Sequence, residues 1–172
     1  MSPAARRRAI GLAIAGVIFA IDQYVKWLVS VPLRLRERGV IDLLPFFDLR
    51  WTENYGVSLG LLRADSMEMR WALIALTGLI ALGVFVWMMR EKALGEVVAL
   101  AMVLGGALGN IRDRKVFGYV IDYADLHFGE FRPFLIFNIA DAAISIGVLI
   151  ILARSFLSRE KPENPANIAP ES

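Results

Sequence analysis

The sequence of 172 residues contains no cysteine and a single histidine, His127. The absence of cysteine excludes disulfide bonds, thiol nucleophiles and thiolate metal sites. A zinc site of the His-Glu-x-x-His type needs two histidines, so that class is excluded as well. We therefore expect no metal and no other cofactor, and any catalysis must come from carboxylate, amide, hydroxyl or basic side chains.

The net charge of the chain is also small. The net charge of +2 is too small, and the basic residues are too scattered, to indicate a nucleic-acid partner. Hydrophobic residues instead make up 57% of the chain, against about 45–50% in a soluble domain. Four apolar runs approach the length of about 20 residues that a helix needs to cross a bilayer: residues 9–29, 71–89, 93–111 and 134–153. The composition predicts an all-α membrane protein with four transmembrane helices, in one domain covering residues 1–157.

The first apolar run follows the triplet Arg6-Arg7-Arg8. This start resembles a secretory signal peptide, but the run continues past Asp22 and Lys26 and is too long for a signal core, so we expect a retained span. The arginine triplet places the N-terminus in the cytoplasm by the positive-inside rule. The outer loops are then residues 30–70 and 112–133, and residues 158–172 are expected to form a disordered cytoplasmic tail.

The first outer loop has structure of its own. From Phe47 to Thr52 apolar and polar residues alternate, which predicts a strand of a small β-rich subdomain resting on the membrane surface. Asn54-Tyr55-Gly56 then predicts a turn. The stretch from Gly56 to Gly60 matches the Gly-x-Ser-x-Gly nucleophile elbow, with Ser58 as nucleophile and His127 as its base. Four spans leave too few residues for the parallel sheet that the elbow requires, so a serine hydrolase is the weaker interpretation.

Polar residues gather where the third span leaves the membrane. Asn110, Asp113 and Arg114 share one helix face, and we expect them to form a hydrogen-bonded group. Arg112 and Lys115 are expected to be interfacial anchors. Just before them, the small-residue spacing of the three glycines of this helix predicts close helix packing; these are Gly105, Gly106 and Gly109.

Two carboxylates follow. Asp122 lies in an apolar stretch, residues 116–123, that we expect to be extended, and Asp141 lies with Asn138 on one face of the fourth span. A charged aspartate at the bilayer centre costs about 2.5–3.5 kcal/mol, which makes it a functional hypothesis by default. Two carboxylates held close together cannot both ionise, so one keeps its proton and the pair can act as acid and base. Asp125 and Glu130, in contrast, are expected to be solvated loop charges.

These residues carry a resemblance. Asp22-x-x-x-Lys26, Asn54-x-Gly56, the stretch from Gly105 to Arg114, Val120-x-Asp122-Tyr123 and Phe137-Asn138-x-Ala140-Asp141 occur in an order and spacing similar to the lipoprotein signal peptidase (signal peptidase II) family. The resemblance implies a bacterial inner-membrane aspartyl protease, active on the periplasmic side. It would remove signal peptides from diacylglyceryl-modified prolipoproteins, cleaving before the lipid-bearing cysteine.

The resemblance also implies roles for individual residues. Asp122 and Asp141 would be the catalytic pair. A second group would bind substrate or orient the pair: Asn54, Asn110, Arg114 and Asn138. A third would support the geometry: Asp22, Lys26, Gly56 and Asp113. The partners implied are the lipid-modified precursor and membrane phospholipid, with a monomeric enzyme. Two positions depart from the family pattern, Leu59 and Pro133, and both affect loop shape and substrate fit.

Two other functions are compatible with intramembrane carboxylates. A proton-coupled transporter would use them as a proton relay, although such proteins more often contain an internal repeat or broken spans, which this sequence lacks. A non-enzymatic membrane scaffold would leave the polar clusters unexplained.

Overall fold

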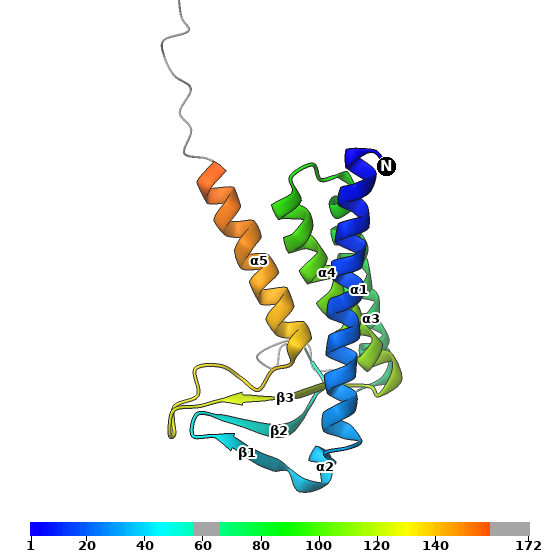
Figure 1. The fold of residues 1–172 in the computed structure, drawn as a ribbon. Coiled ribbons are helices and arrows are strands. Elements are labelled where there is room, and N and C mark those ends of the chain that lie inside the picture. Colours follow the sequence, from blue (N-terminus) through cyan, green and yellow to red (C-terminus); the bar gives the residue numbers. More distant parts are fainter. Residues whose placement is uncertain (57–65, 159–172) are drawn as a thin grey trace, which may run out of the picture.

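The computed structural model describes residues 1–56 and 66–158. Within them, four helices are long and apolar enough to cross a membrane, which confirms the predicted fold. They are α1 (Pro3–Ser30), α3 (Met67–Arg90), α4 (Leu94–Val116) and α5 (Ile139–Ser158). The start of α1 and the end of α5 lie at one end of the bundle, and a small sheet lies at the other (Figure 1). Ser58, Leu59 and residues 159–172 of the predicted tail lie outside the described residues.

Helix α4 is the central element and packs against the other three. Its glycines allow the backbones to approach closely, as predicted. A Cβ built at Gly105 would lie 2.6 Å from the carbonyl oxygen of Ala15 in α1, and one at Gly106 would lie 2.5 Å from that of Ala140 in α5. No side chain fits at such distances, so these two contacts fix how α1 and α5 are seated on α4.

The outer subdomain is an antiparallel sheet of three strands in the order β1-β2-β3. The strands are β1 (Val40–Leu44), β2 (Phe47–Asn54) and β3 (Val120–Leu126), and the one-turn helix α2 (Leu35–Arg38) precedes β1. The predicted strand is therefore present as β2, and its alternating apolar residues pack on a buried cluster that includes Val29 and Tyr123. Strand β1 was not anticipated.

The pairing of β2 with β3 has a consequence for function. Asn54 lies opposite Val120, and Thr52 lies opposite Asp122. The predicted extended stretch begins later than expected, at Val120, because α4 continues to Val116 and the chain then turns at Gly118, whose φ is +92°. The turn returns the chain to the bundle, so that Asp122 lies over the outer end of the helices.

The start of the fourth span was placed too early. Helix α5 begins at Ile139 rather than at residue 134. Phe137 instead pairs with β3: its amide donates to the carbonyl of Ala124 (3.1 Å), and its carbonyl accepts from the Ala124 amide (2.8 Å). Those bonds require extended backbone, so the helix cannot start before Asn138.

The expectation for Asp125 was wrong. Its side chain is fully buried in β3, where it lies across from Asp48 of β2. Two arginines neutralise it: Arg50 Nε lies 3.0 Å and Arg132 Nε 3.2 Å from its carboxylate. Like charges on paired strands destabilise a sheet. Here the two arginines offset Asp125, and His127 lies 2.9 Å from Asp48. Glu130 is exposed, as expected.

Candidate active site

Asp141 lies in the first turn of α5 and takes part in the cap of that helix. The Asn138 side-chain oxygen accepts from the Asp141 amide (2.9 Å), and the Asp141 carboxylate accepts from the Asn138 amide (3.2 Å). This reciprocal arrangement is a capping box. Asp141 is therefore at the mouth of the bundle, not deep in the span, and the positive end of the helix dipole favours its charge there.

Asp122 is held on the facing strand. It is 2% exposed, and both carboxylate oxygens accept amide donors: Asn138 Nδ2 at 2.6 Å and Asn54 Nδ2 at 3.0 Å. Asn138 thus bonds to Asp122 through its side chain and to Asp141 through its backbone. One residue joins the two carboxylates. Asn110 of α4 completes the group by donating to Asp141 Oδ1 (2.8 Å).

The environment of Asp122 favours its protonated form. Its pKa is raised from 3.8 to about 7, most of all by burial and next by the nearby negative charge of Asp141, while the amides of Asn54 and Asn138 oppose the change. At neutral pH the site can therefore hold one proton beside one carboxylate. That is the ionisation state that paired-carboxylate catalysis requires.

This pKa predicts how stability depends on pH. Because the folded protein holds the Asp122 proton more tightly than the unfolded chain, its stabilising contribution is full below pH 4 and is lost as pH rises through about 7. Asp122→Asn cannot ionise. Between pH 5 and pH 8 the melting temperature of the wild type in detergent should therefore fall relative to that of Asp122→Asn. A constant difference between the two melting curves over this range would contradict a raised pKa.

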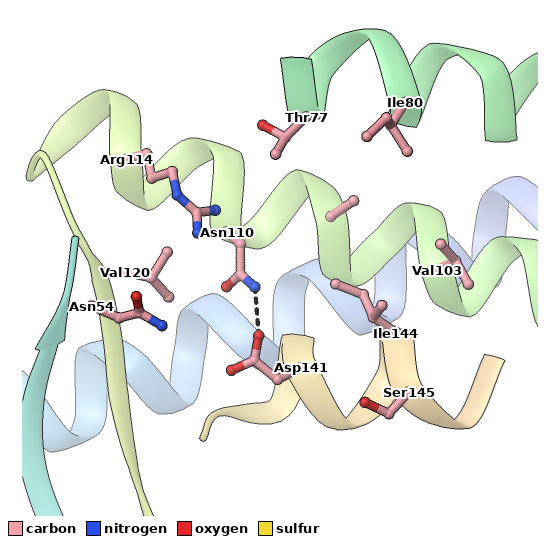
Figure 2. A pocket seen from close by; sticks show the side chains of 11 residues that line it. Asn54, Thr77, Ile80, Val103, Asn110, Arg114, Val120, Asp141, Ile144 and Ser145 are labelled. Atoms are coloured by element: carbon pink, nitrogen blue, oxygen red, sulfur yellow. Dashed lines mark hydrogen bonds between the residues drawn. The ribbon is translucent and has the colours of Figure 1, made fainter. Parts of the chain in front are cut away.

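A cavity of about 300 Å³ opens beside the carboxylates. Figure 2 shows Asp141, Asn110, Arg114 and Asn54 at one end of it and apolar side chains of α3, α4 and α5 along the rest. Asp122 does not line this cavity but is hydrogen-bonded to Asn54, which does, and to Asn138. The cavity thus leads from a mainly apolar region between three spans to a polar end lined by Asp141 and by Asn54, the hydrogen-bond partner of Asp122.

Arg114 and Asn54 hold the strand end beside the cavity. Arg114 Nη2 donates to the carbonyl of Gly56 (2.9 Å), and the amide of Gly56 donates to the Asn54 side chain (3.1 Å). The predicted turn is therefore present and is tied to α4. Sequence reasoning missed Arg70 of α3, which donates to the carbonyls of Arg114 (2.8 Å) and Lys115 (2.6 Å). Arg70 satisfies carbonyls at the end of α4, and only its place near the start of α3 could have suggested this.

A buried cluster of charges supports the site from α1. Lys26 Nζ lies 2.9 Å from Asp22, 2.7 Å from Asp113 and 3.2 Å from the side-chain oxygen of Asn110. The predicted pair of Asp22 and Lys26 is confirmed. Because the Asn110 oxygen faces an ammonium group, its amide nitrogen must face Asp141. Lys26 therefore fixes the orientation in which Asn110 donates to the carboxylate.

Asp113 does not join the hydrogen-bonded group that was predicted with Asn110 and Arg114. Asp113 shares a helix face with Asn110 and Arg114 but turns toward α1, where it accepts from Gln23 (3.2 Å) and pairs with Lys26. His127 lies 2.9 Å from Asp48 in the outer sheet. Within residues 1–56 and 66–158, no group of three or more His, Asp or Glu side chains is arranged to hold a metal ion.

Comparison with known proteins identifies the family. A family model described as signal peptidase (SPase) II matches residues 14–157. The chain belongs to the signal peptidase II family. It is therefore a membrane protease of the signal peptidase II type, and the transporter and scaffold alternatives are not supported.

Individual relatives agree with this assignment. The lipoprotein signal peptidase of Rhizorhabdus wittichii is 55% identical over 159 residues, which cover 92% of each chain. That of Sphingopyxis alaskensis is 56% identical over 151 residues, covering 88% of this chain and 87% of the relative. A solved structure described as a bacterial membrane enzyme, determined by the in meso method at 2.3 Å resolution, is 26% identical, with a TM-score of 0.77 over 91% of this chain and 93% of that one.

Proposed function

We propose that this signal peptidase II cleaves its substrate by aspartic-protease chemistry, with Asp122 and Asp141 as the catalytic pair. The observation that carries the proposal is the double contact of Asn138, which bonds to Asp122 through Nδ2 (2.6 Å) and to Asp141 through its amide (3.2 Å). Catalysis by two carboxylates needs them held in one fixed geometry. A single residue that bonds to both provides it.

In the proposed reaction the ionised carboxylate takes a proton from a water molecule, whose oxygen attacks the carbonyl carbon of the scissile peptide bond. The protonated carboxyl donates to the carbonyl oxygen. When the tetrahedral intermediate collapses, the C–N bond breaks and a proton passes to the leaving amine. Because the two carboxylates would share one proton, we assign neither role to one aspartate alone.

The surrounding residues have separate roles in this proposal. Asn54 and Asn138 orient Asp122, and Asn110 orients Asp141. Arg114 lines the cavity and has guanidinium donors beyond the one that bonds to Gly56, so it can bind a substrate carbonyl. Asp22, Lys26 and Asp113 form the buried support behind Asn110.

We propose a diacylglyceryl-modified prolipoprotein as substrate, cut before the lipid-bearing cysteine. The lipid would hold the scissile bond at the membrane surface, which is the depth at which α4, α5 and β3 bring the two carboxylates together. The enzyme would act as a monomer in the bacterial inner membrane, contact phospholipid there and bind no nucleic acid. Both termini would be cytoplasmic and the site periplasmic.

Incubation of the purified protein with a diacylglyceryl-modified precursor tests the substrate. The same precursor without the lipid is the control. Release of the signal peptide from the modified form alone is expected. Equal cleavage of both forms would show that the enzyme does not need the lipid to recognise its substrate, contrary to the proposal.

Thiol labelling tests the orientation, because the chain has no native cysteine. Glu130 is exposed at the sheet end of the molecule, and Lys92 is exposed in the turn between α3 and α4 at the other end. In intact spheroplasts an impermeant maleimide should label Glu130→Cys, and should label Lys92→Cys only after permeabilisation. Labelling of Lys92→Cys in intact spheroplasts would invert the topology and separate the site from its substrate.

A further inference from the structure

A second and larger cavity also lies against α3. Its volume is about 810 Å³, and its walls come from α1, α3 and α4. The active-site cavity is lined from α3, α4 and α5, together with Asn54 and Val120, and the two cavities have no lining residue in common. Both cavities lie against α3 and α4, one toward α5 and the other toward α1. The proposed reaction does not use this second cavity, which we call the α1–α3 groove.

Small residues make the walls of the α1–α3 groove smooth. Ala15 and Gly16 line it from α1, and Gly78 and Ala81 line it from α3. A Cβ built at Gly16 or Gly78 would meet no atom within 4 Å, although elsewhere in the bundle glycines such as Gly105 are packed tightly against a neighbouring helix. These two glycines therefore do not serve contact between helices. They leave open space on two walls of the groove.

The groove is at least as long as one membrane leaflet. On α4 its lining runs from Leu104 to Lys115. These twelve residues are eleven rises of 1.5 Å, or about 16 Å, and half of a hydrocarbon core about 30 Å thick is about 15 Å. On α1 and α3 the lining continues to Leu12 and Phe85, so the groove runs from the end of α4 that carries the sheet past the middle of the bundle (Figure 1).

The outer end of the groove is basic. Arg112 and Lys115 line it, and both are exposed. Arg112 donates to Gln23, lies 3.8 Å from Asp113 and has its guanidinium 6.0 Å from the centre of the Phe117 ring. Asp22 and Asp113 carry two negative charges against the one positive charge of Lys26, so one negative charge remains beside Arg112. Lys115 has no carboxylate within salt-bridge distance among residues 1–56 and 66–158. Arg112 and Lys115 were expected to be interfacial anchors. Both also lie at the mouth of an apolar groove, a position that an anchor at the membrane interface does not require.

We propose that the α1–α3 groove binds an anionic phospholipid of the outer leaflet. One acyl chain would lie along the small residues of α1 and α3, and the phosphate would pair with Arg112 and Lys115. A neutral hydrocarbon chain could fill the groove without these charges, but the charges select a negative headgroup. This site is separate from the proposed catalytic function and would be present whatever the substrate is.

The experiment is native mass spectrometry of delipidated protein, titrated with phosphatidylglycerol or phosphatidylcholine. The wild type should bind one phosphatidylglycerol in preference to phosphatidylcholine. Arg112→Gln and Lys115→Gln should each weaken phosphatidylglycerol binding about fivefold, the effect of one cation near a charged membrane surface. They should weaken phosphatidylcholine binding less, because its choline ammonium offsets the charge of its phosphate. Arg38→Gln, which removes an exposed cation of α2 outside the groove, is the control for charge.

Leucine at the groove glycines tests the acyl chain. Gly16→Leu and Gly78→Leu lie on different helices, and each should remove the bound lipid while precursor cleavage continues. Gly83→Leu is the matched control, because Gly83 also has open space around a built Cβ but does not line the groove. Equal wild-type affinity for the two lipids, or lipid binding unchanged by both groove variants, would overturn the proposal. A chain dimer lost in those variants would assign the groove to a second copy instead.

Discussion

Asp122→Asn and Asp141→Asn are each expected to reduce cleavage of a lipid-modified precursor by about 10³-fold or more, since acid–base catalysis by one group contributes about 10²–10⁴-fold and the pair shares a single proton. An amide nearly matches the shape of a carboxylate, so the fold should survive. Because both residues act as one unit, the double variant should be little worse than either single variant. The rate of signal-peptide release at equal protein concentration, in detergent, measures the effect.

Two further variants serve as controls for this result. Ser58→Ala and His127→Ala should retain most of the activity, because His127 is paired with Asp48 in the outer sheet (2.9 Å) rather than with the catalytic pair. A serine hydrolase would show the reverse pattern. Near-normal cleavage by either asparagine variant, with folding confirmed, would exclude the proposed aspartic mechanism.

The second large effect is expected on stability. Lys26→Met would leave the buried carboxylates of Asp22 and Asp113 without the ammonium group that lies 2.9 and 2.7 Å from them. Loss of one partner from a buried ion pair costs about 3–5 kcal/mol, because the remaining charge stays buried and unpaired. The melting temperature in detergent should fall markedly. Activity should fall as well, since Asn110 would lose the contact that fixes its amide toward Asp141.

A double variant separates the effect of the buried charge on stability from the effect of the changed side-chain size. Adding Asp113→Asn to Lys26→Met removes one of the unpaired carboxylates and should recover part of the lost stability. Arg36→Met is a control on the surface: its pair with Glu53 is 3.0 Å long, but the arginine side chain is 66% exposed, and exposed pairs contribute only about 0–1 kcal/mol. An effect of Lys26→Met as small as that of Arg36→Met would mean that the buried cluster does not stabilise the fold.

Local patterns in the sequence were sufficient to predict the four membrane-spanning helices and one strand. Membrane spans are recognised by length and apolar composition alone, and the alternation from Phe47 to Thr52 predicted β2. The start of α5 was misplaced because residues 134–137 are all apolar. The helix does not start there because Phe137 pairs with Ala124 of β3, a contact that composition does not reveal.

The candidate site could be predicted only in part. Asp122 and Asp141 were identified because carboxylates are costly near hydrocarbon. Asp125 was misjudged for a related reason: its burial depends on Arg50, 75 residues away in sequence, and on Arg132. Arg70 was missed because its partners are backbone carbonyls of another helix. Such contacts depend on tertiary packing, which a reading along the chain does not include.

The capping box of α5 also bears on when the candidate site can form during membrane insertion. Asn138 caps the helix through its Oδ1 and its backbone amide, and the Nδ2 of the same residue bonds to Asp122. In the proposed mechanism, the catalytic pair therefore forms only together with the first turn of the last span. A chain that is still inserting its final helix would not yet cleave peptide bonds.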